Sequence, residues 1–228
     1  MSGRGRHYIA ARLEEDDNEN ENTSAWLRFR YRVETIFLRS LAGAVSLFPR
    51  PLVLGLAERL GVLAYYVLPE DRRVADWNVE HVFGDSKTPA EKKRIARSSI
   101  KTLARNLANL YRASRLTGEN VRDYVDVDEA NWQWFKQVRA RGKGVIIITP
   151  HFGDWEMGSL ATGLLGEPYV TVVESFKNDE VGKLMSELRG RSGHTTVPPR
   201  FAVIKLFKAL KRGGTIATLI DVNGRRGR

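Results

Sequence analysis

The sequence predicts an α/β fold in which a largely parallel mixed sheet, flanked by helices, follows a helical N-terminal region. After Gly142, short β-branched or apolar runs alternate with helical stretches, which is the pattern of a parallel sheet. Before Gly142 the pattern is helical. The chain has 228 residues, 42% of them hydrophobic, enough for one sizeable core. We therefore expect a disordered polar tail at 1–24, a helical membrane-associating region at 25–142 and an α/β core at 143–228.

The first 24 residues are polar and include an acidic run from Glu14 to Asn22. Such a composition cannot bury enough apolar surface to offset the entropy lost on ordering, which is why we expect disorder here. The segment also lacks the apolar stretch of a secretory signal.

From 26 to 69 the composition changes to Leu, Val, Ala and aromatic residues. The longest uncharged stretches, 40–49 and 60–69, are each shorter than the roughly 20 residues that a spanning helix needs. This favours two amphipathic or buried helices separated by the prolines at 48–51. In the first of them aromatic residues are interleaved with arginines, which suits a bilayer interface. Packing against the protein's own core, or a single tilted span with Arg39 snorkelling, are the alternatives.

The next part of the chain reads as charged scaffold helices, at 71–83, 89–116 and 128–141. The second begins with Thr88-Pro89-Ala90-Glu91, which fits an N-cap followed by proline at the first helical position. Between the second and third helices, 125–127 is predicted as a short edge strand.

The α/β core begins with the β-branched run 145–149, which lies between Gly144 and Pro150 and is typical of a strand buried on both faces. The elements predicted after it are a helix at 154–165, a strand at 169–174, a helix at 179–191, a strand at 194–197, a helix at 201–212 and a strand at 215–220. In sheets of this kind the active site lies at the carboxyl ends of the strands.

Charge and cysteine content restrict the possible functions. The chain has no cysteine, which excludes disulfides, thiolate metal sites and a cysteine nucleophile. Its formal net charge is +10, and from Lys205 to the end there are seven basic residues against one acid, Asp221. This cationic region could face anionic phospholipids, a phosphorylated acyl carrier or nucleic acid, or be an ordinary solvated surface.

The candidate catalytic residues follow the first strand. His151 comes directly after it, Gly153 permits a tight turn, and Glu156 falls in the first turn of the next helix. We expect the Glu156 carboxylate to turn back toward the imidazole, fix one tautomer and leave the other nitrogen free as a general base. Asp154 competes with Glu156 for this role but better suits the N-cap. A buried structural histidine is the alternative interpretation of His151.

The chemistry favoured by this pair is activation of a hydroxyl on the substrate. The chain has neither a Gly-x-Ser-x-Gly elbow nor a cysteine that could carry the acyl group. The sequence therefore favours direct acyl transfer to the substrate, without a covalent enzyme intermediate. A metal-dependent hydrolase is a weaker hypothesis, because His151 and Asp154, with His194 uncommitted, supply too few ligands. We therefore expect no metal site.

The segment 144–156, GVIIITPHFGDWE, resembles the His-x4-Asp/Glu region of bacterial lysophospholipid acyltransferases, in the branch of the lipid A lauroyl and myristoyl acyltransferases. Further blocks agree in the same order along the chain, and the resemblance covers roughly 33–224. These blocks are Arg72-Arg73-Val74-Ala75 leading to Asn78 and Phe83-Gly84, then Phe176-Lys177-Asn178 with 188–193, then 210–214 with Ile220-Asp221.

The resemblance implies roles for particular residues. His151 would be the base and Glu156 its partner, while Arg189 would contact an anionic substrate or the developing oxyanion. Backbone amides near Gly153 would stabilise the same oxyanion. Asp221 matches the third block and is taken, with Arg189 and Gly153, as substrate-binding.

The resemblance also implies substrates and a location. A fatty acyl group would pass from acyl carrier protein or coenzyme A to a hydroxyl of a lipid A precursor, glycolipid or lysophospholipid, with no cofactor beyond this co-substrate. The protein would lie at the cytoplasmic face of the bacterial inner membrane, peripheral or with a single span.

The chain departs from the family at its C-terminus. Family members usually continue beyond Arg228, so the chain is expected to be C-terminally truncated. The alternative function is a non-enzymatic module that binds an anionic membrane or nucleic acid through its basic surface, although no nucleic-acid motif accompanies the charges and no nucleic acid is expected.

Overall fold

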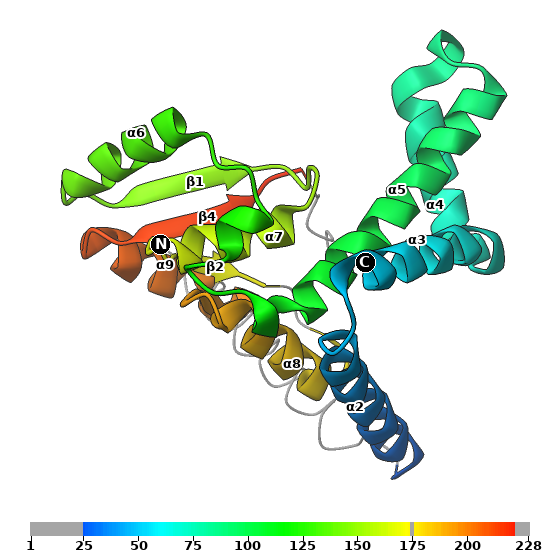
Figure 1. Cartoon of the computed structure of the whole chain (residues 1–228), viewed down its shortest axis with the longest axis horizontal. Helices are drawn as coiled ribbons and strands as arrows, with labels where there is room; N and C mark the ends of the chain where they lie inside the picture. The colour runs from blue at the N-terminus through cyan, green and yellow to red at the C-terminus, as the bar shows by residue number, and fades with distance from the viewer. Residues whose placement is uncertain (1–24, 174–175, 222–228) are drawn as a thin grey trace, which may run out of the picture.

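The structure is a computed structural model that describes residues 25–173 and 176–221. The predicted disordered tail at 1–24 lies outside the described residues, and so does the Gly-Arg-rich end on which the expectation of a truncated C-terminus rests. The described part is a helix-rich α/β protein with a four-stranded sheet. Figure 1 shows α3, α4 and α5 extending away from the sheet.

The N-terminal region is helical, as predicted, and each helix after the first begins at a proline or after a capping side chain. The helices are α2 (Ala25–Val45), α3 (Arg50–Val67), α4 (Pro69–Phe83), α5 (Pro89–Tyr111) and α6 (Glu129–Ala140), with short 3-10 turns at Gly84–Ser86, Ala113–Arg115 and Val121–Asp123. Thr88 and Glu91 form a capping box at the start of α5, with Pro89 in its first turn.

The short edge strand predicted at 125–127 is wrong. These residues are not part of any described strand and lead from a 3-10 turn to Asp128, the N-cap of α6. The side chains of Tyr124 and Val125 pack against the main hydrophobic core instead. Burial of these two side chains, rather than strand pairing, therefore holds the segment.

The sheet has the order β1-β4-β2-β3, and every pairing among the described strands is parallel. Its strands are β1 (Val145–Thr149), β2 (Val170–Val172), β3 (Thr195–Val197) and β4 (Thr215–Leu219), joined by α7 (Trp155–Leu164), α8 (Asp179–Gly190) and α9 (Ala202–Lys211). The expected parallel sheet is thus confirmed, and the described strands give it no antiparallel member. The last strand inserts between β1 and β2, so β1 and β4 end side by side.

Burial of β1 on both faces was a wrong expectation. Ile146 and Ile148 are 54% and 60% exposed, whereas the alternate residues of the strand are half-buried. The reason is topological, because β1 lies at the edge of the sheet and the described elements leave one of its faces open. A continuous β-branched run reports strand propensity without showing which faces are covered.

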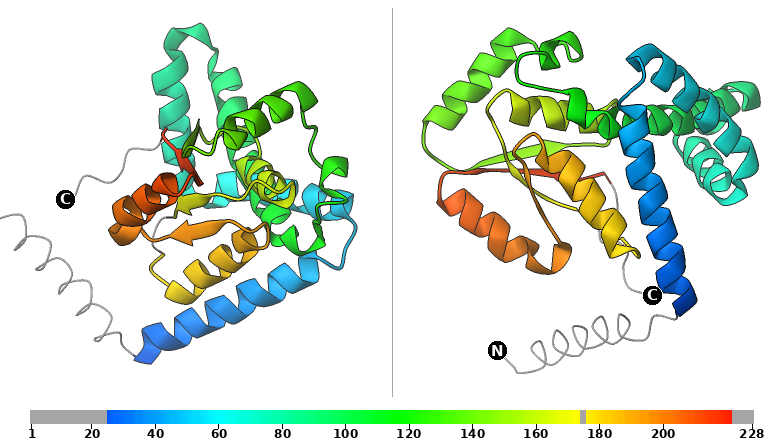
Figure 2. Two further views of the ribbon diagram at one scale, coloured as in Figure 1. Left: turned by 90° about the vertical axis from the view of Figure 1, so that its left-hand side faces the viewer. Right: turned by 60° about the horizontal axis from the view of Figure 1, so that its bottom comes forward.

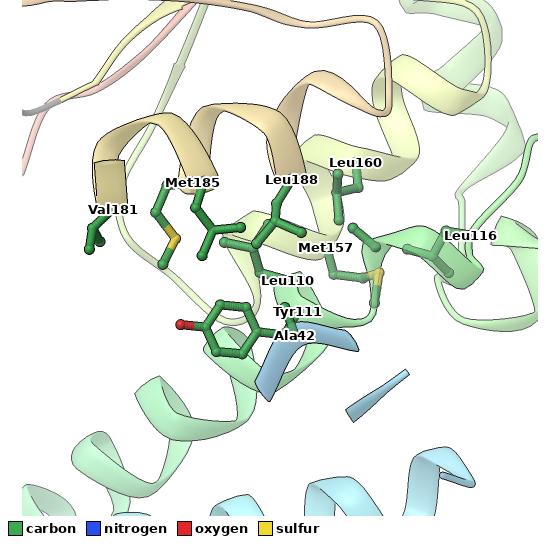
Figure 3. Close-up of a cluster of buried hydrophobic side chains, with 11 residues drawn as sticks. Ala42, Leu110, Tyr111, Leu116, Met157, Leu160, Val181, Met185 and Leu188 are labelled. Carbon is green, nitrogen blue, oxygen red and sulfur yellow. The ribbon is translucent and has the colours of Figure 1, made fainter. Parts of the chain in front are cut away.

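One hydrophobic cluster connects the helical region to the sheet-bearing part. It joins α2, α5, α7 and α8, and Figure 3 shows its side chains. Its labelled members are Ala42, Leu110, Tyr111, Leu116, Met157, Leu160, Val181, Met185 and Leu188. Because α5 and α7 share this core, the loop that precedes α7 is positioned against α5.

A helix must be both long and apolar to cross a membrane. None of the described helices is by itself long and apolar enough to cross a membrane, and α3 and α4 meet that criterion only as a pair, bent by 92° where they join.

Candidate active site

The carboxyl ends of β1 and β4 bring His151 and Asp221 together. The two strands pair along their whole length, and the amide of Ile220 donates to the Thr149 carbonyl just beyond the sheet. His151 Nδ1 lies 2.7 Å from one carboxylate oxygen of Asp221, and the backbone N–H of His151 donates to the other over 2.8 Å. A single carboxylate therefore holds both the main chain and the ring of His151.

This contact determines which ring nitrogen is available. The hydrogen bonds from the His151 ring and backbone hold the pKa of Asp221 below its usual value, the ring contact contributing most. The carboxylate is therefore ionised at neutral pH and accepts a hydrogen bond from Nδ1–H, so in the neutral ring the lone pair is on Nε2. The ring packs edge-on against Trp155, with 4.9 Å between centroids, and about a third of the His151 side chain is exposed. This tautomer presents Nε2, the nitrogen without a partner among the described residues, as the candidate general base.

The expected pairing of Glu156 with His151 is not what the structure contains. Glu156 is 8% exposed, and Arg189 binds its carboxylate in a two-point ion pair with distances of 3.0 and 2.6 Å. The physical reason is the start of α7: the helix begins at Trp155, whose ring meets His151, while Glu156 faces α8. Arg189 was expected to contact substrate, and in the structure its guanidinium binds Glu156.

The preference for Asp154 as an N-cap is confirmed. Its Oδ1 accepts from the Met157 amide over 3.1 Å at the start of α7. Gly153, expected to permit a tight turn, has a φ of 58°, a left-handed conformation that glycine adopts at little cost. Together these two residues turn the chain from the end of β1 into the helix.

Two asparagines that sequence reasoning missed hold this turn from α5. Asn106 donates to the Gly153 carbonyl over 2.7 Å, and Asn109 donates to Asp154 Oδ2 over 2.6 Å. Both are almost fully buried. Their separation of three positions places them on one helix face. Two amide side chains on the buried face of an amphipathic helix were the sequence signal that could have identified them. The helix interpreted only as scaffold therefore positions the His151 loop.

The histidine left uncommitted by the sequence has a structural role. Nδ1 of His194 accepts from the Tyr169 amide, and Nε2 faces the Ser159 carbonyl. Burial lowers the pKa of His194, which keeps the ring neutral. Within 25–173 and 176–221, no group of three or more His, Asp or Glu side chains is placed to hold a metal ion.

The surroundings of His151 combine apolar and polar character. Phe152, Ile148 and Ile220 are all more than half exposed near the base. Among the described residues, no backbone hydrogen bond uses the amides of Gly153 or Asp154, which precede the N-terminus of α7. These two amides and the positive end of the α7 dipole are therefore available to stabilise negative charge near this loop.

The sequence matches a family model that covers most of the chain. A family model described as bacterial lipid A biosynthesis acyltransferase matches residues 25–227, which include every residue of the site. No curated protein matches the sequence.

Proposed function

The chain belongs to the bacterial lipid A biosynthesis acyltransferase family, and from that premise we propose that it moves a fatty acyl group from an acyl thioester to a hydroxyl of a lipid A precursor, glycolipid or lysophospholipid. The donor would be acyl carrier protein or acyl-coenzyme A, with no cofactor besides this co-substrate. The observation that carries the proposal is the His151–Asp221 pair at the carboxyl ends of β1 and β4.

The proposed reaction uses His151 twice. Nε2 removes the proton from the acceptor hydroxyl while its oxygen attacks the thioester carbonyl, and Asp221 stabilises the imidazolium that forms. The tetrahedral intermediate then collapses: the carbon–sulfur bond breaks, the new ester remains, and the imidazolium returns its proton to the departing thiolate. The enzyme forms no covalent bond in this scheme, which accords with the lack of a cysteine or a nucleophile elbow in the sequence.

The negative charge of the intermediate requires donors already in place. We assign this role to the amides of Gly153 and Asp154, at the N-terminal end of α7. Arg189 is engaged by Glu156 on the buried side of the same helix, so we assign the pair to positioning α7 against α8 rather than to contact with substrate.

A direct assay tests the function. Labelled acyl carrier protein and acyl-coenzyme A thioesters are offered separately with each of the three acceptor classes, and the ester product is identified by mass spectrometry. We expect transfer from at least one donor, absent in His151→Ala and retained in His81→Ala, a matched change at an exposed histidine of α4. Transfer that survives His151→Ala would contradict the mechanism, and absence of any transfer by the folded wild type would favour the binding-module alternative.

We further propose that the protein works at the cytoplasmic face of the inner membrane, peripherally or with a single span. Support comes from α3, where four leucines (Leu52, Leu56, Leu60 and Leu63) are each more than half exposed. Their spacing places them along one helix face. Such a stripe suits insertion among the acyl chains of a bilayer.

Vesicle binding tests this location. In cosedimentation with phosphatidylethanolamine–phosphatidylglycerol vesicles, Leu56→Ser with Leu60→Ser should weaken binding at least about tenfold, because two leucine side chains no longer transfer out of water. The control is Val203→Ser with Ile204→Ser, which removes two apolar side chains of α9 that are at least as exposed as the two leucines. Equal losses in both double variants would refute a docking surface on α3.

A further inference from the structure

A second hollow lies away from the His151 centre, where α2 meets α5 and α8. The cavity has a volume of about 510 Å³, within the size range of small-molecule sites. Figure 2 shows α2 running alongside α8, and the two helices are joined there by the Arg39–Glu187 ion pair. None of the residues that line this cavity belongs to the loop between β1 and α7, which contains His151.

The lining carries an excess of positive charge. Three arginines and one acid, Glu187, face the cavity. Arg39 uses both terminal nitrogens on Glu187, with distances of 2.9 Å. Arg115 donates through Nε to the Ser46 carbonyl over 2.7 Å, which fixes its stem and leaves the outer guanidinium nitrogens for a ligand. Arg191 is exposed, and its side chain forms no hydrogen bond or ion pair with the part of the chain that the structure describes.

One hydroxyl in the lining, that of Tyr111, has no hydrogen-bond partner among the described residues. Tyr111 is 5% exposed and belongs both to the cavity wall and to the hydrophobic cluster of Figure 3. Its hydroxyl makes no hydrogen bond with any described residue, and burial raises the pKa of the phenol. Because Tyr111 lines the cavity, its hydroxyl can donate a hydrogen bond to a ligand oxygen there.

We propose that this cavity binds a phosphate group. Guanidinium groups from Arg115 and Arg191 supply charge-assisted hydrogen bonds suited to phosphate oxygens, and the Tyr111 hydroxyl supplies a neutral donor. The lining also has apolar side chains, among them Leu184 and Leu188 of α8. A site that combines cationic donors with leucines fits the head group and first methylenes of a phospholipid better than free phosphate.

Calorimetric titration at constant non-ionic detergent tests the site with three probes: dihexanoyl phosphatidic acid below its micelle concentration, inorganic phosphate, and dihexanoyl phosphatidylcholine. Phosphatidic acid should bind the wild type more tightly than the other two. Arg191→Gln should weaken this binding about tenfold, the loss of one charge-assisted contact. Tyr111→Phe, which keeps the packing, should weaken it about fivefold. Arg212→Gln, at an exposed arginine outside the cavity, is the matched control.

The outcomes separate the sources of the phosphate. Inorganic phosphate binding as tightly as phosphatidic acid, with the same sensitivity to Arg191→Gln, would support the site and assign it to free phosphate. Phosphatidic acid binding no better than phosphatidylcholine, or equal binding by the wild type, Arg191→Gln and Tyr111→Phe, would overturn the proposal. Thermal unfolding of each variant establishes that it is folded, and neither result depends on acyl transfer.

Discussion

Replacing His151 by alanine is expected to lower kcat for acyl transfer about a thousandfold, the usual contribution of a positioned general base. The fold should tolerate the change, because the side chain is about one-third exposed and its ring meets only Trp155 and Asp221 among the contacts described. The free energy of unfolding should therefore stay within about 0.5 kcal/mol of the wild type. Steady-state kinetics and urea unfolding on the same preparations check both parts.

Removing the charge of Asp221, the partner of His151, should also slow acyl transfer. Asp221→Asn keeps the shape of the side chain and removes its charge, so the ring loses its preferred tautomer and the imidazolium its counter-ion. We expect a fall in kcat approaching that of His151→Ala, with KM little changed. Asp123→Asn, at an exposed aspartate far from β4 in the sequence, serves as the control. Full activity in Asp221→Asn would show that the Asp221 carboxylate is not what orients the base.

Replacing Glu156 by alanine is expected to act on stability, lowering the free energy of unfolding by about 3 kcal/mol. The change leaves the Arg189 guanidinium without its partner between α7 and α8, where its side chain is 21% exposed and that of Glu156 is 10% exposed. Breaking such a pair costs far more than breaking one at the surface, because the remaining charge is poorly solvated. Urea unfolding monitored by circular dichroism measures the effect.

A matched surface glutamate provides the control for this prediction. Glu129 also lies in the first turn of a helix and pairs with Arg122, but both side chains are about half exposed. Glu129→Ala should leave the unfolding midpoint close to that of the wild type. If Glu156→Ala unfolds like the wild type but loses kcat as His151→Ala does, then Glu156 acts in the reaction itself and the positioning role assigned here is wrong.

The helices and strands were predictable because their signals are local. Thr88 with Glu91 marked the start of α5, Asp154 marked the start of α7, and each β-branched run after Gly142 became a strand. The placement of His151 at the carboxyl end of β1 followed from the strand alone. These features depend on neighbours within a few residues, which a sequence displays directly.

The partner of His151 was not predictable in the same way, because it depends on the order of strands. Asp221 follows β4, about 70 residues after the histidine, and meets it only because β4 inserts next to β1. Spacing alone made Glu156 the nearer carboxylate, but its place on α7 turns it toward Arg189. The support from Asn106 was hidden for the same reason, since it depends on how α5 packs against α7.

Whether Asp221 or Glu156 orients His151 can be read from the long-range ¹H–¹⁵N correlation spectrum of the histidine rings at a pH where they are neutral. We expect His151 to carry its proton on Nδ1, Asp221→Ala to abolish this preference, and Glu156→Gln to leave it unchanged in the folded protein. A proton on Nε2 in the wild type, or a tautomer that changes in Glu156→Gln and not in Asp221→Ala, would contradict this expectation.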